Sequence, residues 1–514
     1  MVTMKAFMKS GLLLAMSLSA LQAKDAVVTQ LPLNVGAFQE FGAVYDGLHS
    51  AGDVPGAIIS MEWVDHFGAY LNKEAVINDR LHLSGGIGGV FQFRQPEIVD
   101  AGFPGSQRKA FFVGPARTEA VYYFGDTQKP WLKLGAGMFP YKYNPEAVNL
   151  GEYLFRARAY PTTMTTGGYL LANNSGATLQ GFKANYQKGD LKIDALLTTE
   201  TEQAPFYDFS LGLVAAYSVA NGLLDLGAGV NFQHLIPVKP SRTTNPVQEN
   251  SYITNPTTGR DYVGNSNYYS NAAEFYAARA DLYWQKGTHA DTLNAIRDSA
   301  RAAQYTADGT TASSLYSLPD STRPSIKYYT TSAVLLMARA TLDPKKVLAL
   351  PMMGPQDLKL YFEVDVLGLK NYPVYYEKIS ERMPIMMGIN LPCFRILDLL
   401  AVQAEYFNSP WLNNTFSFAS GNHERVNNTP YLPISNDTVL SRTNYNDMTA
   451  KDNWKWSVLA KKTIQNRLTV SFQCARDHLR LPSSKYYYGP QFEPNEVTAF
   501  KDSWYWVTQI SWGI

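Results

Sequence analysis

The chain of 514 residues has few cysteines, almost no net charge and, past residue 23, no long apolar run. Its two cysteines, Cys393 and Cys474, could form one disulfide. The strand order predicted below places Cys393 at a turn and Cys474 well along a strand, so we expect two free thiols. A formal net charge of +1 gives no argument for a nucleic-acid partner. The lack of eighteen consecutive apolar residues argues against membrane-spanning helices.

Sequence motifs of catalysis are also missing. The seven histidines are scattered, and no pair has the spacing of a metal-binding helix motif. The chain contains no nucleophile elbow, no phosphate-binding loop and no dinucleotide fingerprint. We therefore expect no metal site, no cofactor and no enzymatic activity.

The N-terminus has the pattern of a secretory signal peptide. Lys5 and Lys9 supply a positive start, residues 11–20 form a short apolar stretch, and Ala23 is a suitable last residue of the signal. An apolar stretch of this length is too short to span a bilayer. The sequence thus predicts a signal peptide over residues 1–23.

Aromatic residues make up 13% of the chain, and the C-terminal segment shows best how they are arranged. From Trp504 to Trp512, every second residue is mostly large and apolar, and the residues between them are mostly small or polar. These eight steps span roughly 27 Å along a strand, or about 21 Å at a tilt of ~40°. Such a strand suits a sheet with lipid on one side and water on the other.

The same period-two alternation recurs along the chain in segments of about ten residues. A soluble β-sandwich alternates in the same way, so periodicity alone does not separate the two fold classes. The clearest segments are residues 132–138, 191–198, 224–232, 358–366, 400–406, 454–461 and 468–474.

The connections between these segments favour a membrane barrel, because short and long connections alternate. Outer-membrane barrels have short periplasmic turns and longer extracellular loops. We predict an all-β, transmembrane antiparallel β-barrel over residues 57–514, with the C-terminus in the periplasm. Residues 24–56 form either a lead-in or a first strand. Fifteen strands between residues 57 and 513 plus one from residues 37–49 give sixteen, with eighteen as the alternative.

One connection, residues 235–325, is long enough to be an insert. It begins rich in proline and asparagine and then becomes helical over residues 274–284 and 291–304. Asp291 is a plausible N-cap of the second helix. We predict two short helices that either cap the extracellular mouth or fold into the lumen as a constriction; the alternative is a surface decoration with no effect on transport.

Charged residues occur on only one face of the predicted strands, which places them on the side that faces water. A lipid-facing charge costs ~2–4 kcal/mol near the membrane midplane, and inward rows of opposite sign would set a field across the lumen. The predicted pore-lining residues are Lys133, Lys183, Lys192, Asp194, Asp225, Arg339, Lys359, Glu363, Asp365, Glu405 and Lys455. The predicted membrane-girdle residues are Trp454, Trp456, Trp504, Trp506 and Trp512.

With its signal peptide, alternating strands, connection rhythm and aromatic terminal strand, the chain resembles Gram-negative outer-membrane β-barrels of the porin type. The resemblance covers nearly the whole mature chain and is architectural, since no motif identifies a subfamily. It implies location in the outer membrane, contact with its lipid, insertion by the barrel-assembly machinery, and passive transport of small hydrophilic solutes. It also implies a homotrimer as one form of assembly and a loop folded into the lumen, for which residues 235–325 are the candidate. The terminal Ile514 differs from the Phe or Trp usual in the group.

Two further functions remain open on the sequence. In the first, the long loops 408–451 and 477–501 bind an extracellular surface or polysaccharide, as in adhesion. In the second, His82 and Ser84, which share one face of a strand, serve a barrel enzyme, although two such residues are common by chance. Conduction in bilayers, surface binding and loss of turnover on His82→Ala would separate the three.

Overall fold

A computed structural model describes most of the predicted barrel and most of the insert. The described residues are 27–51, 54–93, 109–155, 177–199, 208–236, 251–264, 266–328, 332–348, 350–370, 373–374, 378–408, 453–478, 482–483, 491–492 and 503–513. The predicted signal peptide, the 408–451 loop beyond residue 408 and most of the 477–501 loop lie outside them.

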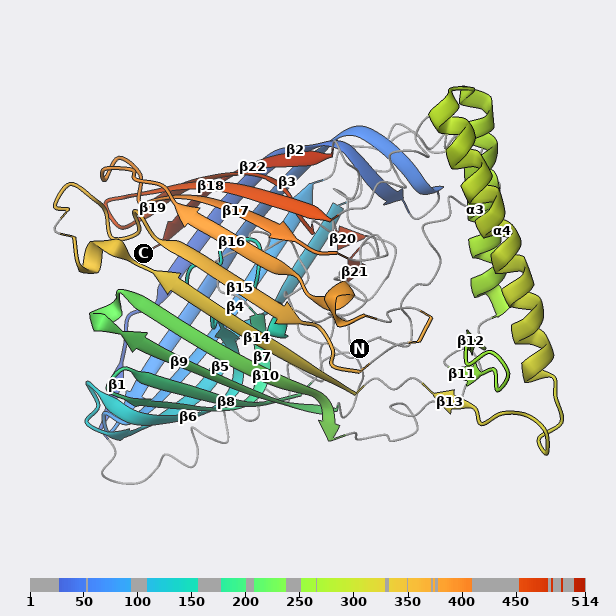
Figure 1. The fold of residues 1–514 in the computed structure, drawn as a ribbon. Helices are drawn as coiled ribbons and strands as arrows, with labels where there is room; N and C mark the ends of the chain where they lie inside the picture. Colours follow the sequence, from blue (N-terminus) through green and yellow to red (C-terminus); the bar gives the residue numbers. More distant parts are fainter. Residues whose placement is uncertain are drawn as a thin grey trace.

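Sixteen antiparallel strands close into one barrel (Figure 1). Each strand pairs with its neighbour in the chain, and β2 closes the barrel by pairing with both β3 and β22. The predicted strand number of sixteen and the predicted fold class are therefore confirmed. The strands are β2 (Asn34–Ala51), β3 (Val54–Ile77), β4 (Leu81–Phe93), β5 (Lys109–Gly125), β6 (Pro130–Tyr141), β7 (Ala177–Lys188), β8 (Leu191–Thr199), β9 (Phe209–Val219), β10 (Leu224–Ile236), β14 (Ala333–Leu342), β15 (Leu360–Val366), β16 (Ile385–Asn390), β17 (Leu399–Tyr406), β18 (Trp454–Ile464), β19 (Leu468–Arg476) and β22 (Trp504–Gly513).

The alternation of side chains sorts the two surfaces of the barrel. On β22, Tyr505 and Val507 point inward and are 1% and 3% exposed, whereas Trp512 on the other face is 43% exposed. The same contrast holds on β18, where Trp454 is 55% exposed and Lys455 only 2%. An exposed apolar outer surface around a buried polar interior is the arrangement of a barrel that spans a membrane.

The two ends of the barrel differ, as the connection lengths predict. At one end, called here the short-turn end, most strands join through two to four residues. The turn after β3 has positive φ at Asn78 (48°) and Asp79 (58°), and that after β18 at Gln465 (51°) and Asn466 (56°). Paired positive φ values are what two-residue hairpin turns require. At the other end, called here the long-loop end, most strands join through connections that are longer by the bounds of the strands they join.

Several smaller elements complete the described chain. β1 (Val28–Gln30) pairs with Ala75–Ile77 of β3, between the part of β3 that pairs with β2 and the turn that follows β3. β20 (Pro482–Ser483) pairs with β21 (Gln491–Phe492). The 3-10 turns are η1 (Tyr153–Phe155), η3 (Ala220–Gly222), η5 (Pro344–Lys346) and η6 (Ile379–Arg382).

The insert folds as a small sheet and a helical hairpin. β11 (Ser251–Thr254) pairs with β12 (Asp261–Val263) and β13 (Lys327–Tyr328), and α3 (Ser266–Lys286) packs against α4 (His289–Tyr316). The helices have 21 and 28 residues, so the prediction of short helices is wrong. Alanine-rich sequence extends them, because alanine costs least in a helix. Figure 1 places the hairpin beyond the ends of the strands.

Two details of the sequence prediction are settled by the described residues. The N-cap of α4 is Thr288, whose hydroxyl accepts from the backbone N–H of Asp291, so the prediction of Asp291 as the cap is wrong by three positions. Cys393 and Cys474 are both free, as predicted. In the described part of the chain, no helix combines the length and the apolar character needed to cross a membrane.

Candidate functional site

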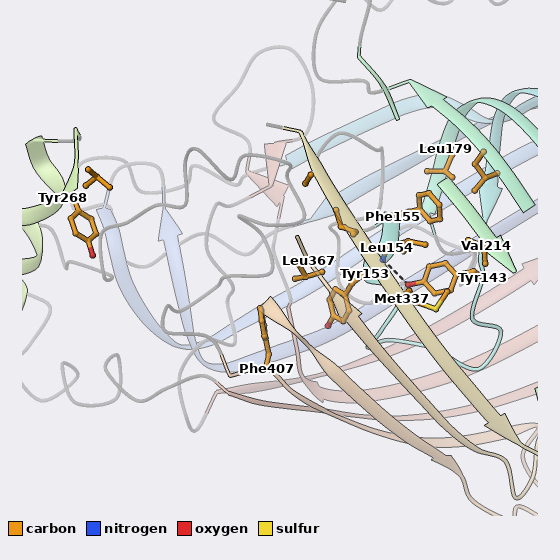
Figure 2. Close-up of a cluster of buried hydrophobic side chains, with 14 of the residues drawn as sticks. Tyr143, Tyr153, Leu154, Phe155, Leu179, Val214, Tyr268, Met337, Leu367 and Phe407 are labelled. Atoms are coloured by element: carbon orange, nitrogen blue, oxygen red, sulfur yellow. Dashed lines mark hydrogen bonds between the residues drawn. The ribbon is translucent and has the colours of Figure 1, made fainter. Parts of the chain in front are cut away.

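The barrel interior contains a stretch of chain that is not part of its wall. After β6 the chain turns back among the strands over residues 142–155, called here the inner segment, which ends in η1 (Figure 2). Most of its side chains are buried, including Leu150 and Leu154 at 0% and Tyr153 at 1% exposure. Its hydrogen bonds reach strands that lie far away in the sequence, and they fall into four groups.

The first group converges on Glu363 of β15, which is fully buried. The Tyr143 hydroxyl donates to Glu363 Oε1 at 2.9 Å, and the backbone N–H of Glu152 donates to the same oxygen at 2.5 Å. The Asn144 amide donates to Oε2. Hydrogen bonds to a buried carboxylate are stronger than those between neutral groups, so Glu363 fixes both ends of the inner segment.

The second group holds the middle of the inner segment. Gln403 Oε1 on β17 accepts from the backbone N–H groups of Asn149 (3.0 Å) and Leu150 (3.1 Å). The Asn149 side-chain amide donates to Asp477 at 2.7 Å, and the Tyr505 hydroxyl donates to the same carboxylate oxygen at 2.7 Å. Burial raises the pKa of the Asp477 carboxyl above its usual range, and these two donors counteract part of that rise.

The third group surrounds Glu405 of β17. The Tyr153 hydroxyl donates to Glu405 Oε2, while His478 Nε2 lies 2.8 Å from Glu405 Oε1 and 3.0 Å from the Tyr153 hydroxyl. On the other side, the Asn231 amide of β10 donates to the carbonyl oxygen of Leu154 at 2.9 Å. The end of the inner segment is therefore held between two parts of the wall.

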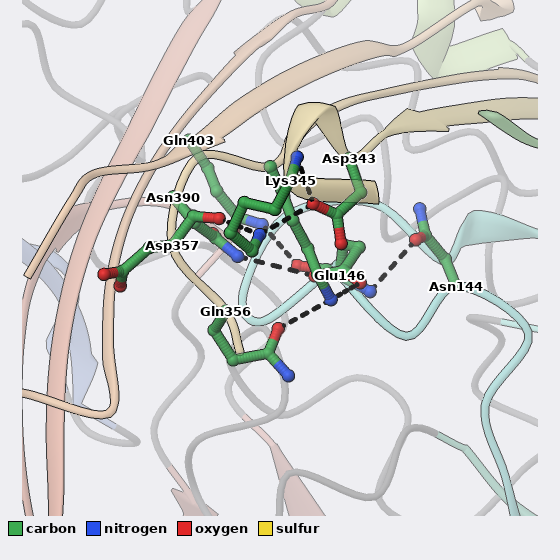
Figure 3. A network of polar contacts seen from close by, with 9 residues as sticks. Asn144, Glu146, Asp343, Lys345, Gln356, Asp357, Asn390 and Gln403 are labelled. Atoms are coloured by element: carbon green, nitrogen blue, oxygen red, sulfur yellow. Dashed lines mark hydrogen bonds and ion pairs between the residues drawn. The ribbon is translucent and has the colours of Figure 1, made fainter. Parts of the chain in front are cut away.

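The fourth group lies toward the short-turn end (Figure 3). Lys359 Nζ, at the start of β15, forms an ion pair with Glu146 Oε1 at 2.7 Å and also donates to Gln356 at 2.8 Å. The Asn390 amide of β16 lies 3.4 Å from Glu146 Oε2. Glu146 thus links the inner segment to residues beside the connections that follow β14 and β16.

A separate charged cluster lines the wall formed by β3, β5 and β7. Glu119 is 5% exposed and accepts from Arg117 and from Lys183 Nζ, the latter at 2.6 Å. Arg117 Nη1 also lies 3.4 Å from Glu74 Oε1, and the side chains of both residues are 38% exposed. Two cations and two carboxylates therefore share this face.

The predicted pore-lining residues divide by their surroundings, although a role in conduction remains a prediction for all of them. Glu363, Asp365, Glu405, Arg339 and Lys455 are buried on the inner face. Lys359 and Lys183 form the ion pairs described above. The Asp194 carboxylate accepts hydrogen bonds from Tyr141 (2.9 Å) and Asn185 (2.7 Å), and the Asp225 carboxylate accepts one from Ser218. Lys133 Nζ lies 5.1 Å from the centroid of the Tyr123 ring. Lys192 is exposed near the short-turn end.

The sequence did not reveal the inner segment, for which residues 235–325 were the candidate. Its contacts join residues up to 328 positions apart, and no local period encodes them. A usable signal was the dense group of large apolar side chains inside a long connection, Leu150, Tyr153, Leu154 and Phe155. Apolar residues of that kind are unusual in a connection exposed to water.

Comparison with other proteins adds distant structural likeness only. No protein-family model and no curated protein matches the chain. A Rhodopseudomonas blastica porin with five substitutions is 7% identical with a TM-score of 0.39, and the match covers 94% of this chain and 100% of the porin. A triple mutant of the same porin is 6% identical with a TM-score of 0.36, at the same coverage. The chain's own strand pairing, sixteen strands closed around a polar interior, confirms the porin-type architecture predicted from the sequence.

Proposed function

We propose that this protein is an outer-membrane channel through which small hydrophilic solutes diffuse passively. The observation that carries the proposal is the inner segment, a stretch of chain fastened inside a closed barrel by the buried carboxylates Glu363, Glu405 and Asp477. A barrel of sixteen strands is wide enough for an aqueous channel, and a segment within it sets the size limit. The long-loop end would face outward and the C-terminus the periplasm.

Charge supports the same proposal. The wall cluster around Glu119 and the carboxylates around the inner segment place both signs of charge inside the barrel. Charged groups lining a narrow aqueous path select solutes by charge and dipole.

His82, on which an enzymatic function would depend, stacks on Tyr123 with ring centroids 4.2 Å apart, which favours a packing role for this ring.

Insertion by the barrel-assembly machinery and a homotrimeric state belong to the same proposal. The outer row of β22, which includes Trp504, Trp506 and Trp512, would present the aromatic signal of the terminal strand. With Trp454 and Trp456, the same tryptophans would form the membrane girdle, since aromatic residues concentrate at membrane interfaces.

The first test is the single-channel conductance of the refolded full chain in a planar bilayer. Replacing residues 143–153 by a glycine-serine linker of equal length removes the side-chain donors that the inner segment supplies to Glu363, Asp477 and Glu405. We expect steady openings from the parent and a conductance raised by about twofold or more in the variant, because conductance grows with the free cross-section. A folded protein that never conducts contradicts the proposal.

Charge selectivity gives a second prediction. Glu119→Gln leaves Arg117 and Lys183 without the carboxylate that both contact, so the wall cluster gains one net positive charge. We expect the reversal potential under a salt gradient to shift toward anion selectivity, by several millivolts for one charge in a narrow lumen. Asp126→Asn, at an exposed turn, is the control and should leave the potential unchanged. An equal shift in both variants would remove Glu119 from the conduction path.

A further inference from the structure

Two connections at the short-turn end expose large apolar side chains. Val347, Leu348 and Met352 follow β14 and are 67%, 52% and 70% exposed. Phe394 and Ile396 lie between β16 and β17 and are 50% and 75% exposed. These five side chains are called here the turn patch. Exposing an apolar surface of this kind to water is energetically unfavourable.

The other described turns at the same end are polar, which makes the turn patch a local feature. They contain no large aliphatic or aromatic side chain between the strand ends, apart from Leu223 beside β10. These turns are residues 78–80, 126–129, 189–190, 220–223 and 465–467.

The two connections are held together and do not vary independently. Arg395 Nη2 donates to the carbonyl oxygen of Pro351 at 3.0 Å, which links the connections directly. The Asp357 carboxylate accepts from the backbone N–H groups of Gly354 (2.8 Å) and Phe394 (3.2 Å). Lys462 Nζ, from β18, donates to the carbonyl oxygen of Arg395 at 2.8 Å. The turn patch is thus one preorganised surface.

Most of the exposed charges around the turn patch are positive, and the exposed carboxylate of the second connection, Asp398, is 3.3 Å from Lys462 Nζ and paired with it. Lys346 and Arg395 are exposed within the two connections, and Arg467 is exposed on the next turn. The carboxylates of the first connection, Asp343 and Asp357, are 8% and 1% exposed and accept hydrogen bonds within it. An anionic partner therefore meets cations first.

The turn patch also continues the outer surface of the barrel. Leu342 and Leu360 are paired in register where β14 ends and β15 begins, and they are 36% and 44% exposed on the outer face. Phe362 and Met387 continue that face along the neighbouring strands, at 38% and 50% exposure. The apolar outer surface therefore runs past the ends of these strands into the first connection.

We propose that the turn patch inserts into the headgroup region of the membrane leaflet at the short-turn end and binds anionic phospholipids through Lys346 and Arg395. A surface with large apolar side chains and lysine or arginine beside them partitions into an anionic lipid interface. Its continuity with the outer surface favours lipid over a soluble protein as the occupant. The proposal depends on the barrel spanning a membrane and does not depend on conduction.

Insertion is tested with spin labels in the full chain folded into vesicles of equal parts phosphatidylcholine and phosphatidylglycerol. Labels are placed by Met352→Cys and Ile396→Cys in a Cys393→Ser, Cys474→Ser background, with Gln128→Cys on a polar turn as the control. We expect the first two labels to collide more often with oxygen than with an aqueous nickel chelate, and the control label to show the reverse.

Headgroup binding is tested by counting the phospholipids retained by the purified protein, offered in the same mixture. Each cation at an anionic surface contributes ~1 kcal/mol, a factor of about five, so Lys346→Gln with Arg395→Gln should lower the preference for phosphatidylglycerol by about 25-fold. Lys129→Gln with Lys188→Gln removes two exposed cations, one in a polar turn and one at the strand end beside another, and is the control.

Two results overturn the proposal. One is a nickel accessibility at positions 352 and 396 equal to that at position 128. The other is an unchanged phosphatidylglycerol preference in the Lys346, Arg395 double variant. Neither measurement uses conductance, so failure here is distinguishable from failure of the channel.

Discussion

Replacing Glu363 by alanine is expected to detach the inner segment and to lower the free energy of unfolding by about 3–5 kcal/mol. The substitution removes one fully buried acceptor and leaves the Tyr143 hydroxyl, the Asn144 amide and the Glu152 backbone N–H without it. An unpartnered buried donor costs the full penalty of leaving water. Urea unfolding in lipid vesicles, followed by tryptophan fluorescence, measures the loss.

The matched control for this prediction is Glu74→Ala. Its side chain is 38% exposed and meets Arg117 at 3.4 Å, a contact of the kind that contributes below about 1 kcal/mol. In bilayers, the Glu363 variant should also show a noisier and wider open state than the parent, because the inner segment would then move. Equal unfolding midpoints for Glu363→Ala and Glu74→Ala would mean that Glu363 does not anchor the segment.

The second large effect is expected where the barrel closes. A Cβ atom at Gly42 of β2 would lie 2.0 Å from the backbone oxygen of Trp506 on β22, so Gly42→Ala must push the two closing strands apart. Overpacking of this kind costs about 1–3 kcal/mol and more when backbone has to move. We expect the folding yield into vesicles to fall severalfold, as read from the heat-dependent shift in gel mobility.

Gly85→Ala supplies the comparison for the closing strands. It adds the same methyl group to β4, where a Cβ would meet nothing within 4 Å, so its folding yield should match that of the parent. A normal yield for Gly42→Ala would mean that the pairing of β2 with β22 adapts without loss. A low yield for both variants would point to a general intolerance of alanine in these strands.

The strands were predictable because their positions follow a rule that acts locally. Along β22, one residue in two faces outward and the next faces inward, so the row that includes Trp504 and Trp512 is readable from the sequence alone. The number of strands followed from connection lengths, because alternating short and long connections assign each strand end to one side of the membrane and so require an even number of strands. Thr288 was missed as the cap of α4 because aspartate, which stands three residues later at Asp291, ranks above threonine at the N-cap position.

The inner segment was not predictable by the same rule. Asn149 and Tyr153 are placed by acceptors on β17 and by Asp477 and His478 beyond β19, and neither their spacing nor their identity reflects a period. The buried acids Glu363 and Glu405 were recognised as inward-facing, since a charge on a strand avoids lipid. What they bind depends on which chain segment lies opposite, and that is a property of the closed barrel.

The four groups of hydrogen bonds that hold the inner segment have a consequence for the order of assembly. Tyr143 and Glu363 are 220 positions apart in the sequence, and Asn149 and Asp477 are 328 apart. Forming these contacts before β15 to β19 are in place would cost a large loop-closure entropy. Hairpins between neighbouring strands form first, because their partners are close in sequence. The segment docks only when the wall that receives it exists, so the interior reaches its final width at the last stage of folding.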